Sequence, residues 1–210
     1  MRLRYKKWAM PELEDNNLIF FDPTELKGRW NQVFKNDNPI YLELGAGRGK
    51  FTTINAERNP DINYIALEME AGALVYAARK FKESGLDNIR GIRSMAQKLL
   101  EFFDEGEISK IYINFCNPWP KNRQHKRRLT YPTLLKIYKS ILHEKGTIEL
   151  KTDDLPFFED SLKYFEKAGL KVSDINYDLP ADKNGNIVTE YEAKWRSQGV
   201  KINYLMAEKE

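Results

Sequence analysis

The chain has 210 residues, which is enough for one domain with a substantial core, and its 41% hydrophobic and 12% aromatic content excludes a disordered protein. The formal net charge of +3 is small, so binding to a polyanion would depend on local clusters of cations. A single cysteine, Cys116, excludes an internal disulfide, and the two histidines make a structural zinc site unexpected. No signal peptide or membrane-spanning apolar run is visible, so we expect a cytoplasmic protein with no membrane segment and no metal.

Short β-like runs alternate with amphipathic helical patterns, which predicts an α/β fold with a mostly parallel sheet and helices on both faces. The predicted strands are 40–44, 62–67, 89–93, 108–115, 147–151, 171–177 and 201–207. The predicted helices are 50–57, 71–83, 96–103, 130–142, 156–168 and 189–197, with Gly146 and Gly169 at helix ends. Residues 1–35 lack clear periodicity, and we expect a basic, aromatic arm that folds over a single domain of residues 36–210.

A glycine-rich segment follows the first predicted strand and reads ELGAGRGKF. Its glycines are Gly45, Gly47 and Gly49, which allow a sharp turn and the close approach of a ligand to the next helix. Glu43 would repel a pyrophosphate, but it suits a cationic ligand such as S-adenosylmethionine. Glu68 ends the second strand, where a carboxylate can accept both ribose hydroxyls. A glycine loop alone is also compatible with a structural turn, whereas the two carboxylates favour a methyltransferase-type cofactor site.

Residues 114–131 read NFCNPWPKNRQHKRRLTY and contain no acidic residue. Prolines on both sides of Trp119 predict a stiff, non-helical loop, and Trp119 itself could stack on a base or pack in the core. The cations that follow are Lys121, Arg123, Lys126, Arg127 and Arg128. Such a cluster indicates nucleic-acid binding, although a solvated face is the alternative. A second basic cluster, MRLRYKKW, begins the chain and ends at Trp8.

These motifs bring out a family resemblance. The chain resembles the bacterial tRNA (guanine-N7-)-methyltransferases along nearly its whole length, in the blocks MRLRYKKWA, YLELGAGRGKF, NYIALEME, YINFCNPWPKNRQHKRRLTY, ELKTDD and TEYEAKW. The resemblance implies a Rossmann-like class I fold of seven strands with an antiparallel last strand. It also implies S-adenosylmethionine as cofactor, tRNA as partner, and methylation of N7 of the variable-loop guanosine at position 46.

The resemblance also assigns site residues. Toward the cofactor it places Glu43, Gly45, Gly47, Gly49, Glu68, Met95, Ala96 and Asn117, the last also as the candidate catalytic position. Toward the substrate it places Lys121, Asp153, Thr189, Glu190, Tyr191 and Glu192. Toward the RNA it places Arg123, Gln124, His125, Lys126, Arg127 and Arg128. Three positions depart from the family pattern: Asn117 and Met95 replace acidic or amide residues, and Gln124 replaces a histidine.

Guanine N7 carries a lone pair and no proton, so its methylation needs no general base, and the enzyme's task is alignment. Carboxylates are the natural readers of the N1–H and N2–H₂ donors of guanine, and Asp153 and Glu192 are the candidates. Each has a structural alternative, because Thr189-x-x-Glu192 forms a capping box and Thr152-Asp153 could cap a helix.

The rival from another functional class is a catalytically impaired tRNA-binding module that retains the fold, an alternative motivated by Asn117. A small-molecule methyltransferase is a more distant rival, which the two basic clusters disfavour. Cys116 is interpreted as a buried strand-end thiol rather than a nucleophile. The sequence leaves open whether the protein is a monomer or a homodimer.

Overall fold

The computed structural model describes residues 6–21 and 23–210, and of Glu190 it describes the main chain only. The chain divides into two compact units, Met1–Asp104 (unit 1) and Glu105–Glu210 (unit 2). The predicted boundary at residue 35 therefore falls inside unit 1. The first part of the N-terminal basic cluster, with Arg2, Arg4 and Tyr5, lies outside the described residues.

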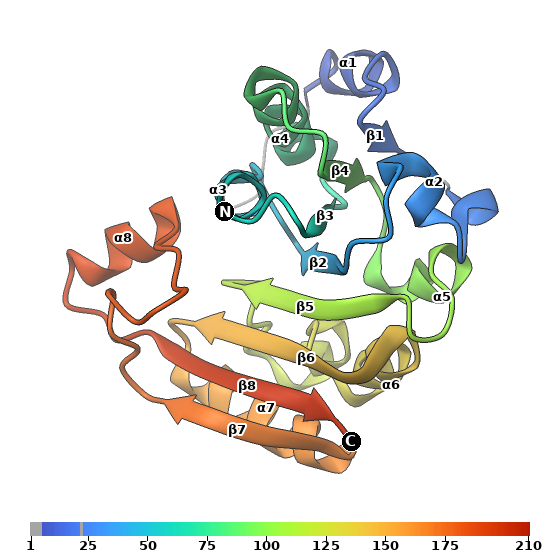
Figure 1. Ribbon diagram of the computed structural model, residues 1–210. Coiled ribbons are helices and arrows are strands. Elements are labelled where there is room, and N and C mark those ends of the chain that lie inside the picture. The colour runs from blue at the N-terminus through green and yellow to red at the C-terminus, as the bar shows by residue number, and fades with distance from the viewer. Residues whose placement is uncertain (1–5, 22) are drawn as a thin grey trace. The chain divides into compact units, whose positions relative to one another are not determined.

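Unit 1 contains four parallel strands in the order β1-β4-β3-β2 (Figure 1). They are β1 (Ile19–Phe20), β2 (Ile40–Leu44), β3 (Asn63–Leu67) and β4 (Ile89–Ile92). Every residue of β3 is buried, as expected for a parallel strand that is covered on both faces. Because the strands are parallel, the residues that follow β2, β3 and β4 leave the sheet at one edge.

Helices connect these strands, close to the predicted positions. They are α3 (Lys50–Arg58), α4 (Ala71–Ser84), the 3-10 helix η2 (Ala96–Lys98) and α5 (Leu99–Phe102). The amphipathic α4 buries Leu74, Ala77 and Phe81, and it ends at Gly85, whose left-handed φ of 65° allows the chain to leave the helix.

The N-terminal segment differs from the predicted arm, because its described part is built into unit 1. It contains α1 (Ala9–Glu14), β1, the 3-10 helix η1 (Thr24–Leu26) and α2 (Trp30–Phe34). Trp30 is fully buried, donates from Nε1 to the Phe102 carbonyl at 3.0 Å, and stacks on Phe103. Elements of two to six residues are too short to show a hydrophobic period, so no local pattern predicts them.

Unit 2 contains the other four strands in the order β5-β6-β8-β7. They are β5 (Ile108–Asn114), β6 (Leu142–Thr152), β7 (Leu170–Asn176) and β8 (Asn203–Lys209). β5 and β6 are parallel, and β8 runs antiparallel to both β6 and β7, which confirms the predicted antiparallel last strand. β6 begins earlier than predicted, so Gly146 lies inside a strand and not at a helix end, whereas Gly169 does follow a helix. With β1, the described residues form one more strand than the seven predicted.

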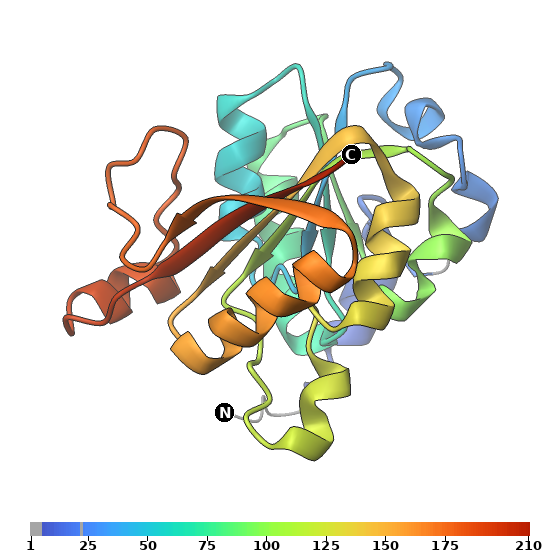
Figure 2. The same ribbon diagram turned by 90° about the horizontal axis from the view of Figure 1, so that it is seen from below.

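The helices of unit 2 are the 3-10 helix η3 (Asn122–Arg127), α6 (Pro132–Ile141), α7 (Leu155–Lys167) and α8 (Glu190–Arg196). Figure 2 shows α6 and α7 covering one face of the strands of this unit. α8 and the irregular segment before it lie beyond the carboxyl ends of β5 and β6 (Figure 1).

In the part of the chain that the structure describes, no helix is both long and apolar enough to cross a membrane.

Candidate active site in two units

The glycine loop, residues 45–49, joins β2 to α3 in unit 1. All its glycines have left-handed φ angles, 73° at Gly45, 57° at Gly47 and 72° at Gly49. They serve different purposes: a Cβ on Gly49 would lie 2.6 Å from the Cβ of Ala77, whereas a Cβ on Gly47 would have nothing within 4 Å. Gly49 is therefore required for the packing of α3 on α4, and Gly47 keeps the outer side of the loop open to a ligand.

Glu68 follows β3 and fixes the glycine loop. Its Oε2 accepts from the Gly47 N–H at 2.9 Å and its Oε1 accepts from the Glu70 N–H at 2.8 Å. The loop is also anchored by the N–H groups of Gly45 and Ala46, which donate to the Leu67 carbonyl. These bonds orient the carboxylate while leaving further lone pairs on both oxygens, which can accept ribose hydroxyls.

Glu43, at the end of β2, is buried at 5% exposure, and its carboxylate accepts a hydrogen bond from the Thr52 hydroxyl on α3. A buried carboxylate with a bound hydroxyl keeps its position. Glu43 thus holds a buried carboxyl group just before the glycine loop, which is compatible with the cationic ligand predicted from the sequence.

Met95 and Ala96 follow β4, at the same edge of the unit 1 sheet. Met95 is 45% exposed and stands at the N-cap position of η2, whereas Ala96 is buried. Met69, after Glu68, is also exposed, at 49%. Two exposed thioether side chains at this edge offer apolar contact area beside Glu68.

The proline loop, residues 115–121, follows β5 in unit 2. It carries two non-glycine residues with left-handed backbones, Phe115 at φ 49° and Trp119 at φ 45°, a strained arrangement of the kind found at functional sites. The Asn117 side chain stabilises the turn, because its Oδ1 accepts from the Trp119 N–H at 3.0 Å. Desolvation raises the pKa of the neighbouring Cys116 thiol to about 12, in agreement with an inert thiol.

The basic residues after the loop separate into two kinds. Lys121, Arg123, Lys126 and Arg127 are exposed, Gln124 and His125 are half-buried, and the Arg127 guanidinium lies 5.1 Å from the centre of the Trp119 ring. Trp119 is itself half-buried. It is therefore not a core residue, and only part of its ring is accessible for stacking on a base.

Arg128 is an exception among these cations, because it has an acidic partner from a distant part of the chain. Its side chain is buried, Nη1 donates to Asp160 Oδ2 at 2.7 Å, and Nε donates to the Pro118 carbonyl at 2.7 Å. Arg128 therefore joins the proline loop to α7. The partner is 32 residues away along the chain, so no local pattern could have shown it.

Asp153 follows β6, and the structure removes its alternative role as a helix cap. The N-cap of α7 is Asp154, whose carboxylate accepts from the Phe157 N–H at 2.8 Å, while Thr152 Oγ1 accepts from the Asp154 N–H. Asp153 is half-buried, and the Tyr191 hydroxyl donates to its Oδ2 at the long distance of 3.5 Å. A half-buried carboxylate with this long contact can still accept donors from a substrate.

The aromatic ring of Tyr191 lies between Phe115, at 5.1 Å, and Trp195, at 5.7 Å between ring centres. Partial burial raises the pKa of Tyr191, so its hydroxyl stays a donor near neutral pH. The residue nevertheless remains 45% exposed. The ring is thus held in place on its sides while a large part of it is accessible to a planar ligand.

Thr189 caps α8 as the capping box predicts, with its hydroxyl accepting from the Glu192 N–H at 3.0 Å. The Glu192 carboxylate is fully buried and accepts from Lys151 at 3.2 Å and from Arg196 at 2.7 Å. Glu192 therefore holds α8 on β6, and in this arrangement its oxygens face protein cations rather than a base. The side chain of Glu190 lies outside the described residues.

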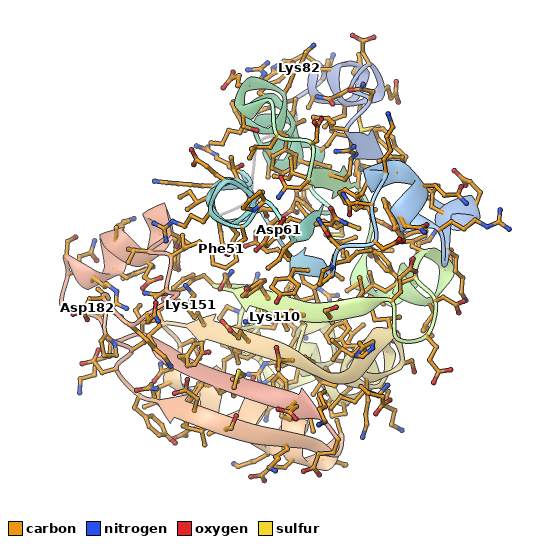
Figure 3. The ribbon with its side chains drawn as sticks, viewed as in Figure 1. Phe51, Asp61, Lys82, Lys110, Lys151 and Asp182 are labelled. Atoms are coloured by element: carbon orange, nitrogen blue, oxygen red, sulfur yellow. The ribbon has the colours of Figure 1, made fainter. Side chains whose placement is uncertain are left out.

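Lys151 is a buried charged residue near Asp153 and Glu192 that the sequence pattern did not single out as a site residue. Its ammonium is buried, and it donates to Asn186 Oδ1, to the Ile187 carbonyl and to Glu192. Lys151 is labelled in Figure 3. The one signal available was a lysine within the apolar strand sequence IELKT. Within the described residues, no group of three or more His, Cys, Asp or Glu side chains could hold a metal ion.

The observed elements and the glycine loop define a class of fold, the Rossmann-like class I methyltransferases, and solved structures agree. The 16S rRNA methyltransferase KamB matches with a TM-score of 0.66 and 17% identity, over 86% of this chain and 92% of KamB. Geranyl diphosphate C-methyltransferase from Streptomyces coelicolor A3(2), solved with S-adenosyl-L-homocysteine, matches with a TM-score of 0.58 and 15% identity, over 83% of this chain and 70% of that chain.

Closer relatives specify the family. The family model described as "Putative methyltransferase" matches residues 37–205. A tRNA (guanine-N(7)-)-methyltransferase of Clostridium tetani is 48% identical over 99% of both chains, and one of Bacillus velezensis is 47% identical over 96% of this chain and 94% of the relative. The chain therefore belongs to the tRNA (guanine-N7-)-methyltransferase family, which confirms the resemblance found in its motifs.

Proposed function

We propose that this protein is an enzyme that transfers a methyl group from S-adenosylmethionine to N7 of a guanosine in tRNA. The observation that carries the proposal is the identity of nearly half of all residues, over the full length, with relatives named for that reaction. We further propose the variable-loop position 46 as the target, the cytoplasm as the location, and a monomer or homodimer as the active form.

Unit 1 fits the cofactor. Gly47 leaves open space beside the glycine loop, Glu68 presents an oriented carboxylate for ribose hydroxyls, and Glu43 holds a buried carboxyl group next to the loop. Met95 and Met69 would cover apolar surface of the base. When bound, S-adenosylmethionine supplies the methyl group, which is already activated as part of a sulfonium.

Unit 2 fits the RNA. We assign Asp153 as the acceptor for the N1–H and N2–H₂ donors of guanine, and Tyr191 as the ring on which the exposed base stacks. Arg123, Lys126, Arg127 and Lys121 are exposed and would contact phosphates, with Gln124 and His125 as half-buried neighbours. We assign Arg128, Thr189 and Glu192 to positioning these groups, a role supported by the contacts of Arg128 with Asp160, of Thr189 with the Glu192 N–H, and of Glu192 with Lys151.

Methyl transfer to guanine N7 needs no general base. Guanine N7 brings a lone pair and no proton, so a residue at position 117 would act through position and field. Asn117 therefore remains the candidate catalytic position, because its amide keeps the loop turned as an aspartate would.

Mapping N7-methylguanosine in tRNA after incubation with the protein and S-adenosylmethionine tests the proposal. We expect methylation by the wild type and a loss of about 10–100-fold in single-turnover rate for Asp153→Asn, since a charge-assisted hydrogen bond contributes roughly 1.5–3 kcal/mol. The matched control is Asp154→Asn, which should keep the wild-type rate because asparagine caps a helix as well as aspartate does.

Binding of both cofactor and tRNA without transfer by the wild type would instead support the impaired tRNA-binding module. Equal single-turnover rates for Asp153→Asn and Asp154→Asn would mean that Asp153 does not bind the guanine.

A further inference from the structure

A surface of unit 1 gathers cations around two aromatic rings, and the proposed function does not use it. This cation–aromatic surface consists of Lys6, Lys7, Trp8, Arg48, Tyr76, Arg79 and Lys80. Its members come from the segment before α1, from the glycine loop and from one face of α4, where Tyr76, Arg79 and Lys80 are three and four residues apart.

Tyr76 is the centre of the surface. The Lys6 ammonium donates to the Tyr76 hydroxyl at 2.7 Å and lies 4.0 Å from the centre of the ring, and the Arg48 guanidinium lies 5.0 Å from the same ring. The hydrogen bond from Lys6 lowers the pKa of Tyr76. The Tyr76 ring and hydroxyl thus hold the two cations close together. Because these partners are not carboxylates, the two cations can still attract an anionic ligand.

Trp8 is 43% exposed, although an indole is one of the largest apolar groups a protein can bury. The Tyr76 ring meets it edge-on at 6.1 Å, and the Arg79 guanidinium lies 4.8 Å from its centre. These contacts hold the indole in place at the surface. An ordered, accessible indole beside cations is suited to stacking on an unpaired base.

Acidic side chains act on Arg79 of this surface, whereas the contacts seen for its lysines among the described residues are to neutral groups. Arg79 donates two hydrogen bonds to Glu12, of which the one from Nη2 measures 2.6 Å, and Glu83 is a second acid near it. Lys6 and Lys80 donate to a hydroxyl and to carbonyl oxygens, and Lys7 is exposed. A polyanion is the ligand that such a surface attracts.

The surface is continuous with the glycine loop. Arg48 lies between Gly47 and Gly49, and Lys80 on α4 donates to the Arg48 carbonyl at 3.1 Å. The cations therefore border the proposed cofactor site of the same unit.

We propose that the cation–aromatic surface is a second RNA-binding surface, which contacts phosphates of the tRNA through Lys6, Lys7 and Lys80 and stacks an unpaired base on Trp8. The inference rests on the proposed function for the identity of the RNA. An acidic protein segment would explain the cations but not an exposed indole held between a tyrosine and an arginine, whereas every base has a flat face that stacks.

The test measures tRNA affinity against salt concentration for Lys7→Gln, Lys80→Gln and Trp8→Leu, with calorimetry of S-adenosylmethionine binding and the thermal midpoint as controls for folding. Each lysine variant should weaken tRNA binding severalfold and make the log–log salt slope shallower by about one unit. Trp8→Leu should weaken binding about tenfold or more while leaving the slope unchanged, because it removes a stacking contact and no charge.

The matched control is Arg58→Gln, an exposed cation at the opposite end of α3 from the glycine loop, which should keep the wild-type slope. Variants that retain cofactor binding and the wild-type affinity and slope for tRNA would overturn the inference, and methylation by the same protein would show that the proposed function survives. If the wild type failed to methylate tRNA, the proposed function would fall, and the salt slopes would still decide whether this surface binds RNA.

Discussion

The glycine loop of unit 1 and the proline loop of unit 2 both follow a parallel strand, and they hold unusual backbone conformations by different means. In the glycine loop the left-handed residues have no side chain, and the turn is fixed by main-chain N–H groups that donate to Glu68 and Leu67. In the proline loop the left-handed residues are Phe115 and Trp119, and the turn is fixed by side chains.

The difference reflects what each loop has to present. A loop that lets a cofactor approach its backbone benefits from the absence of Cβ atoms. A loop that contacts a large polyanionic substrate needs rings and cations, so it accepts backbone strain at a cost of about 1–3 kcal/mol per residue and compensates through anchoring side chains. The glycine loop therefore depends on small residues, and the proline loop depends on anchoring side chains.

The largest effect should come from the buried ion pairs of unit 2. Glu192→Gln removes the negative charge between Lys151 and Arg196, and it should lower the free energy of unfolding by about 3–4 kcal/mol because Lys151 stays buried without its partner. Urea denaturation measures this loss. The control is Glu159→Gln on the exposed side of α7, which should change stability by less than about 0.5 kcal/mol. Equal stability in the two variants would mean that Glu192 is available to read the base after all.

The next effect concerns the glycine loop. Gly49→Ala places a methyl group 2.6 Å from the Ala77 Cβ at a left-handed φ, and should cost about 2–3 kcal/mol of stability. Gly47→Ala has the same backbone strain without a clash, and should cost only about 1 kcal/mol. Thermal or urea unfolding of both variants separates the cost of the steric clash from the cost of backbone strain. Identical losses of stability would contradict the separate roles of the two glycines.

A smaller effect is expected at the anchor of the proline loop. Arg128→Met keeps the aliphatic stem but removes the bonds to Asp160 and to the Pro118 carbonyl, for a loss of about 2 kcal/mol. The matched variant Arg123→Met should leave stability unchanged and make the salt slope of tRNA binding shallower by about one unit. If Arg128→Met changed the slope and not the stability, Arg128 would be a phosphate contact.

The smallest effect concerns Asn117. Asn117→Asp keeps the oxygen that accepts from the Trp119 N–H, so the single-turnover methylation rate should change by no more than about tenfold, or about 1.4 kcal/mol. Asn117→Ala removes that acceptor and should be slower than either. A wild type that binds cofactor and tRNA without transfer, combined with transfer restored by Asn117→Asp, would establish the impaired module in place of the enzyme.

The sequence determined those features whose signal is local. The alternation of β2, α3 and β3 follows from hydrophobic periodicity, and the glycine loop follows from three glycines placed directly after a strand. The cap of α8 by Thr189 was also visible, because a capping hydrogen bond joins residues only three apart. The antiparallel β8 came from family resemblance rather than from a local pattern.

Tertiary structure decided the partners of the polar side chains. Arg128 was grouped with the exposed cations, and Glu192 with the base readers, because a sequence shows charge but not burial. Their partners lie 32 and 41 residues away, at Asp160 and Lys151, and only the packing of α7 beside the proline loop and of α8 against β6 brings them together. Since the free energy of a charged group depends on its burial and its partner, residues of the same charge acquired different roles when the chain folded.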